Sequence, residues 1–556
     1  MTEDFDETDC FVKKNYIDAA KSKTNGVMPS TNYEFEKKDN LITIKDDLEV
    51  LKLHDNLPFR SPMESNESFN QPRNVLCKTI DESNCCFKDE IEQSRIFLKE
   101  SESWMCFVNE EFINHDYITQ KNIDHSNLET KFEKIYVKDD HTFNTHVLFC
   151  DLHINSLPHE LLLRIFSFFS QRELCLFVAP VCSLWFSLTK DSSFWDSIHS
   201  VDYEDVSSSL LCKVLVSWCR HVTTLELDKR CDLSYNDFQL IFQNCSNINN
   251  LSLVFCSQIN ADIFSLVGKY LKELNSISIE GCHEVSDHSL YHLIGLPLKH
   301  FNLAYCNRIS DDGAIFIARN FSSLFFINLD GVQWITESFI EVLVQKHFHS
   351  LEEIFLDGEN LTDYTLCLLS KCRQLRVLSF SFCTLMTSET LLFTSQFSKL
   401  KHLKLRKGIN FTKESLVYFL KSMSEEQASK FRYLNFGECV SITDECLMYI
   451  GKRFFNIIEL DLSWCWDVSD EGLSFIINNC CHLKKLHLQG MHEICGSHFS
   501  KIASSLKKLV FLDLRQCNKV DDDFIDGLVK CMENLVVLNY YGDIVVNRSN
   551  KKMHLS

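Results

Sequence analysis

Glycine and proline are scarce in this sequence of 556 residues, which contains 15 glycines and 7 prolines. Soluble proteins usually contain roughly 7% glycine and 5% proline, and an all-β sandwich uses many of them in its turns. A helix-rich repeat protein needs fewer. The sequence also has no apolar run of the ~18 residues that a membrane-spanning helix requires, so we expect no membrane partner.

Basic residues are fewer than acidic ones: the sequence contains 56 lysines and arginines and 77 aspartates and glutamates, which gives a formal charge of −21. Such a surface repels phosphate backbones, so we expect no nucleic-acid partner. The first ten residues, MTEDFDETDC, are acidic where a secretory or mitochondrial presequence would be basic. The 26 cysteines include no C-x-x-C pair. We expect free thiols in a reducing compartment, cytoplasmic and/or nuclear.

Catalytic and metal-binding motifs are also missing. The sequence has no G-x-G-x-x-G, P-loop, H-E-x-x-H or G-x-S-x-G motif, and no paired Cys/His spacing of a RING-type zinc module. We interpret His141 and His146 as solvated residues rather than as ligands. The chain is therefore expected to be no enzyme and to need no cofactor and no metal.

The composition changes along the chain. Residues 1–150 hold 30 acidic and 18 basic residues, a net charge of −12, without sustained hydrophobic periodicity. This composition buries too little apolar surface to offset chain entropy, so we predict a mostly disordered region. We place a compact helical domain at residues 151–200, a repeat array at 201–545 and a short tail at 546–556.

The compact domain is expected to contain three helices. The first spans Glu160–Phe169, where apolar residues recur on one broad helical face. Pro158 sets the backbone at its start. A second helix begins near Gln171 and ends before Pro180, and a third runs from Val181 to Leu188.

A repeat of about 26 residues fills the rest of the chain. Its anchor position falls at 256, 282, 306, 332, 359, 383, 408, 439, 465, 491 and 517. This regularity indicates a leucine-rich solenoid. The one long gap, of 31 residues between 408 and 439, predicts a convex-side loop near residues 422–430.

Each repeat unit has a readable structure. An L-x-L core such as Leu460-Asp461-Leu462 predicts a short strand whose leucines point inward, and a Ser/Thr-Asp pair such as Ser469-Asp470 predicts the N-cap of a returning helix. The anchor cysteines are interpreted as small buried hydrophobes with a weak donor, not as metal ligands.

The segment from Leu157 resembles an F-box, whose pattern combines LP-x-E-L-L, an acidic residue before leucine, V-C-x-x-W and a closing tryptophan. The matching residues are Leu157, Pro158, Glu160, Leu161, Leu162, Ile165, Ser167, Glu173, Leu174, Val181, Cys182, Trp185 and Trp195. Phe169 stands where the family usually has leucine. One residue more than usual separates Glu173 from Val181. An N-terminal helical cap of the solenoid is the alternative interpretation.

Together with the cysteine-containing repeats, the sequence resembles the F-box/leucine-rich-repeat family. The expected fold class is α/β: a small three-helix F-box followed by a curved solenoid with a strand and a helix per repeat. The resemblance implies a substrate receptor of a Skp–cullin–F-box ubiquitin ligase, which docks on the Skp adaptor and, through it, joins a cullin-RING ligase. The residues expected to bind the adaptor are Leu157, Pro158, Leu161, Leu162, Ile165, Phe166 and Leu174. The alternative function is a non-ligase interaction scaffold.

The substrate, a protein that the sequence does not identify, is expected on the concave face, on the outward residues of the strands and their neighbours. The candidates are Asp330, Glu353, Asp357, His402, Lys404, Arg406, Glu459, Asp461, Lys485 and His487. Lys404 and Arg406 are expected to pair with an acidic or phosphorylated segment of that substrate, because they are basic groups on an acidic protein. An ordinary solvated surface is the alternative.

Overall fold

The computed structural model describes residues 154–547 of the chain. The region predicted to be disordered, residues 1–150, lies outside them. Within the described residues, no helix has both the length and the apolar character needed to cross a membrane.

The first described domain is helical. A 3₁₀ turn, η1 (Ile154–Ser156), leads into α5 (His159–Phe166), which Pro158 precedes and whose first turn contains Glu160. The other elements are α6 (Gln171–Glu173), η2 (Leu174–Val178), α7 (Ser183–Leu188) and the 3₁₀ turns η3 (Ser192–Phe194) and η4 (Ser200–Tyr203).

The first helix ends three residues before the predicted end at Phe169. Ser167 donates its hydroxyl hydrogen to the carbonyl of Arg164 at 2.8 Å, and Ser170 then adopts the extended backbone of an N-cap. Ser170 and Glu173 form a capping box that starts α6. Two serines that compete for backbone groups therefore break the apolar periodicity into two helices.

The extra residue of this F-box-like segment is absorbed by a π-helical turn, η2. The Ala179 N–H donates to the Leu174 carbonyl at 2.8 Å, five residues back, where an α-helix would bond four residues back. Leu174, Cys175, Val178 and Ala179 all stay buried as a result. Pro180 follows the last turn and removes no helical hydrogen bond.

A single sheet runs through the rest of the described chain, in the sequence order β1 to β15. All neighbouring strands are parallel except the last pair, β14 and β15. The strands are β1 (Ser197–Ile198), β2 (Thr224–Glu226), β3 (Asn250–Ser252), β4 (Ser276–Ser278), β5 (His300–Asn302), β6 (Phe326–Leu329), β7 (Glu353–Leu356), β8 (Val377–Phe380), β9 (His402–Leu405), β10 (Tyr433–Asn435), β11 (Glu459–Asp461), β12 (Lys485–His487), β13 (Phe511–Asp513), β14 (Val536–Leu538) and β15 (Ile544–Val545).

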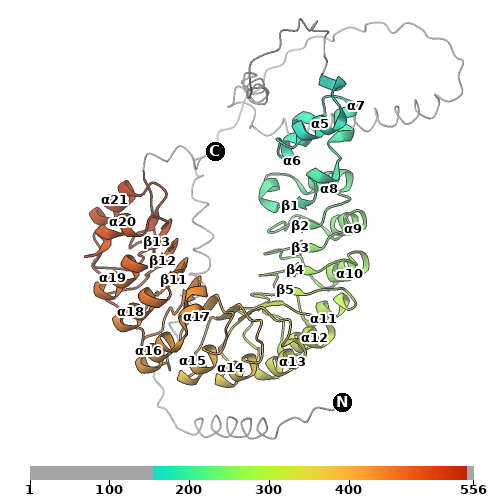
Figure 1. The fold of residues 1–556 in the computed structure, drawn as a ribbon. Coiled ribbons are helices and arrows are strands. Elements are labelled where there is room, and N and C mark those ends of the chain that lie inside the picture. Colours follow the sequence, from blue (N-terminus) through green and yellow to red (C-terminus); the bar gives the residue numbers. More distant parts are fainter. Residues whose placement is uncertain (1–153, 548–556) are drawn as a thin grey trace, which may run out of the picture. The chain divides into compact units, whose positions relative to one another are not determined.

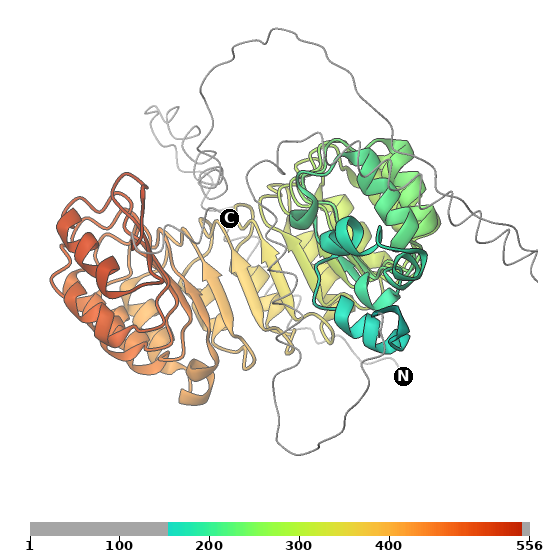
Figure 2. The same ribbon diagram turned by 90° about the horizontal axis from the view of Figure 1, so that it is seen from above.

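The helices follow the strands one by one and cover the outer side of the curved sheet (Figure 1; Figure 2). They are α8 (Ser208–Trp218), α9 (Tyr235–Asn244), α10 (Ala261–Tyr270), α11 (Asp287–Leu290), η5 (Tyr291–Leu293), α12 (Asp311–Asn320), α13 (Glu337–His347), α14 (Asp363–Leu369), α15 (Ser388–Thr394), α16 (Lys413–Ser422), α17 (Glu425–Lys430), α18 (Asp444–Arg453), α19 (Asp470–Asn479), η6 (Phe499–Lys501), α20 (Ile502–Ser505) and α21 (Asp522–Cys531). This alternation confirms the predicted fold class.

The prediction of a loop near residues 422–430 is wrong. That segment contains the extra helix α17, which begins with a capping box between Ser424 and Gln427. The S-x-x-Q spacing satisfies two backbone donors at the helix start, so a helix forms where only an insertion was predicted.

The anchor cysteines hydrogen-bond from one repeat to the repeat before it. The Cys256 thiol lies 3.2 Å from the Leu227 carbonyl, and the Cys465 thiol lies 3.2 Å from the Phe436 carbonyl. Cys282, Cys306, Cys439 and Cys517 make the same contact at 3.0–3.1 Å. These thiols are buried, and burial raises the pKa of Cys256 to about 12. The predicted role of a small hydrophobe with a weak donor is confirmed for these six.

The Ser/Thr-Asp pairs link neighbouring repeats as well as capping helices. The Asp444 carboxylate accepts the Ser469 N–H at 2.8 Å and the Ser469 hydroxyl at 2.6 Å, one repeat further on. Asp287 and Asp311 make the same two bonds to Ser310 and Thr336. Each aspartate thereby fixes the start of the next helix.

The helical domain and the first repeats share one core. The Trp195 ring stacks on Trp218 with centroids 5.7 Å apart, and Phe186 meets Trp218 edge-on at 5.8 Å. Gln171 donates to the carbonyls of Phe194 and Ser197, both at 2.8 Å. These contacts join α6 and α7 directly to β1 and α8.

Candidate functional site

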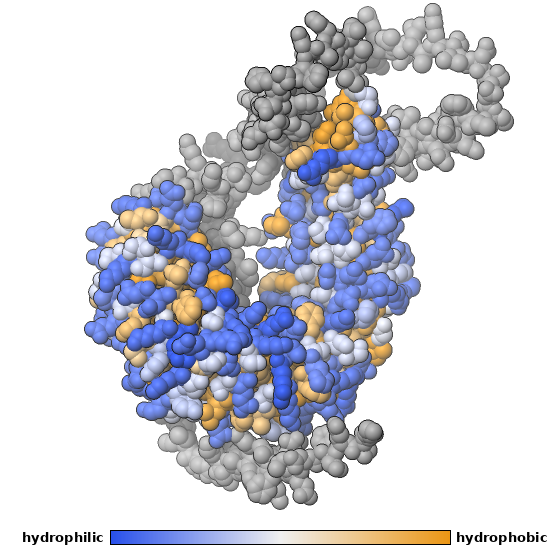
Figure 3. Space-filling view, viewed as in Figure 1, coloured by the Kyte–Doolittle hydropathy of each residue, from blue (hydrophilic) through white to orange (hydrophobic). Residues whose placement is uncertain are grey.

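The F-box-like domain exposes apolar side chains around α5 and η2. Leu161, Phe168, Phe177 and Val181 are between 51% and 60% exposed. Figure 3 shows apolar residues gathered at this end of the described chain. Arg164 lies 5.6 Å from the centre of the Phe168 ring, in cation–π range. We call these four side chains the apolar F-box face.

Seven residues of this domain were predicted to face an adaptor, and they divide into three groups. Pro158 and Leu161 are exposed, and Leu157 and Ile165 are partly buried against the core. Leu162, Phe166 and Leu174 are buried completely or almost completely, so of the two positions that the sequence left open, adaptor face or domain core, these three lie in the core. They hold the three helices together.

The sequence analysis missed Phe168, Phe177 and Val181. Phe168 lies seven residues after Leu161, a helical spacing that the sequence displays. The exposure of Phe177 follows from the π-helical turn, because the extra residue enlarges the turn and leaves Phe177 outside while Val178 stays inside. A regular helical wheel does not show this.

The predicted substrate residues lie along the inner face of the sheet, in two rows set by the strand register. One row runs through Glu353, His402, Glu459 and Lys485, and the other through Lys404, Asp461 and His487. Asp330, Asp357 and Arg406 follow the ends of β6, β7 and β9.

The two predicted basic groups already have partners. The Lys404 ammonium donates to the Ser381 hydroxyl at 2.8 Å and lies 3.4 Å from the Asp330 carboxylate. The Arg406 guanidinium lies 2.5 Å from the Glu438 carboxylate. Carboxylates of the chain itself therefore neutralise both groups, and the pairing of Lys404 and Arg406 with an anionic substrate stays a prediction.

The acidic candidates are also engaged. Asp461 accepts from the Asn435 amide at 2.6 Å, and Glu459 lies 3.4 Å from the Lys485 ammonium and 3.3 Å from the His487 ring. Burial opposes the ionisation of Glu459, yet His487 and Lys485 together lower its pKa. Charges of opposite sign alternate here instead of forming separate clusters.

Two carboxyl groups on this face carry raised pKa values. Burial raises the pKa of Asp357 to about 6, and the nearby Asp330 carboxylate adds to the shift. Burial and the neighbouring Glu352 raise the pKa of Glu353.

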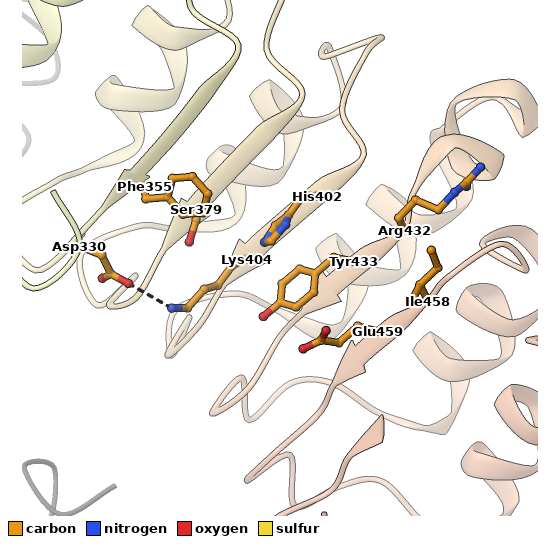
Figure 4. Close-up of a pocket in the computed structure, with 9 residues that line it drawn as sticks. All are labelled: Asp330, Phe355, Ser379, His402, Lys404, Arg432, Tyr433, Ile458 and Glu459. Carbon is orange, nitrogen blue, oxygen red and sulfur yellow. Dashed lines mark hydrogen bonds and ion pairs between the residues drawn. The ribbon is translucent and has the colours of Figure 1, made fainter. Parts of the chain in front are cut away.

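A shallow depression of about 560 Å³ lies over β7 to β11 (Figure 4). Its lining residues are Asp330, Phe355, Ser379, His402, Lys404, Arg432, Tyr433, Ile458 and Glu459. His402 stacks on Tyr433 with ring centroids 3.8 Å apart, and Phe355 meets His402 at 6.0 Å. The depression combines an aromatic floor with charged walls. Among the described residues, no group of three or more His, Cys, Asp or Glu side chains is arranged to hold a metal.

Comparisons with known proteins agree with this architecture. The F-box-like family model matches residues 154–200, and the Leucine Rich repeat model matches residues 297–318 and 455–476. F-box/LRR-repeat protein 5 of Danio rerio is 46% identical over 48 residues, which cover 9% of this chain and 7% of that protein.

Two longer matches are DNA repair proteins of yeasts. RAD7 of Saccharomyces cerevisiae is 24% identical over 352 residues, 58% of this chain and 56% of RAD7. The protein rhp7 of Schizosaccharomyces pombe is 25% identical over 289 residues, 49% of this chain and 50% of rhp7. The chain thus spans about half the length of these two relatives.

A solved complex of Rad7 and Elc1 in yeast contains a similar chain, with a TM-score of 0.48 and 16% identity over 82% of this chain and 96% of that chain. The F-box-like segment and the leucine-rich repeats that follow it give the chain the architecture of F-box/leucine-rich-repeat proteins.

Proposed function

We propose that this protein is the substrate receptor of a ubiquitin ligase of the Skp–cullin–F-box type. In this proposal the F-box, residues 151–200, docks on the Skp adaptor, and the repeats, residues 201–545, hold a protein substrate that is ubiquitinated and then degraded by the proteasome. The chain itself carries out no chemical step. It supplies proximity, and a ubiquitin-conjugating enzyme in the assembly supplies catalysis.

The observation that carries the proposal is the apolar F-box face. Leu161, Phe168, Phe177 and Val181 expose large apolar side chains within the segment that matches the F-box-like model, residues 154–200. Contiguous exposed apolar surface is a feature of protein–protein interfaces. An adaptor that covers these four side chains removes them from water, which favours association by roughly 25 cal/mol per Å² of apolar area.

The test is capture of purified Skp adaptor by the full-length chain, followed by addition of the cullin. The variant combines Leu161→Asp with Phe177→Asp, which places two charges on the apolar F-box face. Leu240→Asp, at an exposed leucine on α9, is the matched control. We expect the double variant to lose adaptor capture while the control retains it, with melting temperatures close to that of the wild type for both. Adaptor capture by the folded double variant would contradict the proposal.

A non-ligase scaffold is the second candidate. It uses the same inner face of the repeats but requires no adaptor. The capture experiment separates the two candidates, because a scaffold would retain its repeat-dependent partners and bind no Skp adaptor. Elc1, which accompanies Rad7 in the solved complex, belongs in the same experiment as an alternative adaptor.

The two longer relatives, RAD7 and rhp7, are DNA repair proteins. They support the proposal that this protein acts at least partly in the nucleus. Imaging of a fluorescently tagged full-length chain tests this, and strictly cytoplasmic fluorescence would contradict it.

A further inference from the structure

A row of five residues, four of them basic, runs across the starts of the strands, and two of its members, Arg432 and Ile458, line the depression. Each member directly precedes a strand, and its backbone N–H donates to the carbonyl of the preceding member. The Lys401 N–H donates to Arg376 at 2.8 Å, Arg432 to Lys401 at 2.7 Å, Ile458 to Arg432 at 2.7 Å and Lys484 to Ile458 at 2.7 Å. We call these five residues the strand-start row.

Three cations of this row have no carboxylate partner. Arg376 pairs with Glu352 at 2.9 Å, but within residues 154–547 no ion pair forms at Lys401, Arg432 or Lys484. All three side chains are exposed. Arg432 donates only to the carbonyls of Ser429 and Phe431, at 2.8 and 2.9 Å, so its charge stays uncompensated.

The acidic groups in the depression, unlike these three cations, have partners of opposite charge or hydrogen-bond donors within the chain. Asp330 accepts from Ser381 at 2.5 Å and pairs with Lys404, and Glu459 pairs with Lys485. Since the chain neutralises these anions itself, Arg432 carries the charge of the depression that is left for a ligand. Lys401 and Lys484 extend the same positive charge on either side.

The floor beside Arg432 is aromatic and uncharged at neutral pH. The His402 ring contacts both Tyr433 and Phe355, and Ile458, which lines the same depression, is 36% exposed. Burial lowers the pKa of His402 to about 4, so the ring is a neutral aromatic surface at pH 7. An apolar or aromatic side chain is complementary to such a floor.

We propose that this surface binds an extended peptide segment in which an aromatic side chain is flanked by anionic groups, either carboxylates or phosphates. Adjacent strands lie ~4.8 Å apart, so Arg432 and Lys484, two strands apart, are separated by roughly 10 Å, about three residues of extended chain. The aromatic side chain enters the depression, and the anions meet Arg432 and its neighbours. The inference rests on the proposed function in that the segment belongs to the substrate.

The experiment measures fluorescence anisotropy of a labelled nonapeptide with the full-length chain. The peptide has a central phenylalanine with two glutamates on each side, and a second version has phosphoserine in place of the inner glutamates. Control peptides replace the phenylalanine by glycine or the glutamates by lysine. The protein variants are Arg432→Glu and Lys484→Glu, and the matched control is Lys421→Glu, at an exposed residue of α16.

We expect at least one anionic peptide to bind, and the tighter version identifies the anion. Binding should weaken at least tenfold in Arg432→Glu and in Lys484→Glu, stay unchanged in Lys421→Glu, and weaken with added salt. The glycine peptide should bind more weakly and the lysine peptide not at all. Equal binding to wild type and to a folded Arg432→Glu variant, or binding of neither anionic peptide, would overturn the inference.

Light scattering at the same protein concentration tests whether a second copy of the chain, instead of a peptide, occupies this surface. A wild-type dimer that dissociates in Arg432→Glu would assign the surface to another copy of the chain and overturn the inference. Adaptor capture is measured separately, so loss of peptide binding with intact capture contradicts only this inference. Loss of capture with intact peptide binding contradicts only the proposed ligase function.

Discussion

Trp464 and Gly490 occupy equivalent positions in neighbouring repeats, each directly before an anchor residue. Both have left-handed backbone conformations, with φ of 62° and 71°. The Trp464 N–H donates to the Gln489 carbonyl at 2.7 Å, which holds this unfavourable conformation in place. The indole ring fills the space above Gly490, so the two residues are complementary in size.

Gly490→Ala should destabilise the protein by about 2–4 kcal/mol, because alanine is strained at this φ and its Cβ would lie 2.3 Å from Trp464 Cε3. Urea unfolding followed by circular dichroism measures the effect. Gly527→Ala on α21 is the control, since a Cβ there meets nothing within 4 Å. It should be neutral or stabilising by up to about 1 kcal/mol. Equal stabilities of the two variants would contradict the packing argument.

Asp357 makes stability depend on pH. Burial raises its pKa to about 6 in the folded chain, above 3.8, so the folded state binds the proton more tightly than the unfolded state. Its ionisation therefore lowers stability as the pH rises from about 4 to about 6, by up to about 3 kcal/mol. Asp357→Asn keeps an oxygen acceptor for the Glu359 N–H, 3.1 Å from Asp357 in the wild type.

The asparagine variant should be more stable than wild type at pH 7.5 and equally stable near pH 4. Chemical unfolding at both pH values measures the difference. A stability gain of the same size at both pH values would point to a cause other than ionisation.

At the scale of single elements, η2 shows how the F-box accepts an extra residue. The π-helical turn places Leu174, Cys175 and Val178 inside and Phe177 outside.

Deletion of Phe177 should convert the turn to an α-helix and leave the domain folded, with a melting temperature within a few degrees of wild type. Deletion of Leu163 from α5 should instead rotate Phe166 out of the core, a loss of about 3–5 kcal/mol. Thermal unfolding of both deletions tests this, and equal losses would refute the π-turn account.

The links between elements follow from the aspartates at the helix starts. Asp444→Ala removes the acceptor of the Ser469 N–H and hydroxyl and should cost about 1–3 kcal/mol. Glu445→Ala, next in sequence and paired with Lys413 only at 3.6 Å on the surface, should cost under about 1 kcal/mol. Urea unfolding measures both. A larger loss in Glu445→Ala would contradict the role assigned to Asp444.

Local sequence patterns predict the elements but not these links. The L-x-L pattern and the Ser/Thr-Asp pair fix strands and helix starts, because both act within a few residues. The bond from Asp444 to Ser469 depends on how one repeat stacks on the next, and the pair of Lys404 with Asp330 joins residues 74 positions apart. For this reason the sequence predicts that Lys404 and Arg406 lie on the inner face, but it does not reveal that carboxylates of the chain already pair with both. The sequence pattern does not reveal the strand-start row, because its members stand one residue before each strand, outside the alternating positions that mark the inner face.

At the scale of the molecule, the F-box-like domain, the repeats and the final hairpin share continuous packing. Trp195 and Trp218 join the first domain to the array, and the sheet then passes without interruption from β1 to β15. β15 runs antiparallel to β14, so the last repeat ends in a short hairpin instead of an open parallel strand. Each internal repeat depends on neighbours on both sides to cover its apolar residues.

A chain that ends after Cys465 should therefore fail to form a soluble, cooperatively melting protein. The cut removes β12, which pairs with β11, and exposes residues such as Leu460 and Leu462 that are fully buried in the intact chain. A chain that ends after Asn547 keeps the whole described sheet and is the control; it should melt like the full-length protein. Gel filtration, dye binding to exposed apolar surface and thermal unfolding compare the two. A monomeric fragment ending at Cys465 with a sharp transition would mean that the first repeats are stable without their neighbours, and the array would then consist of separate folding units rather than one.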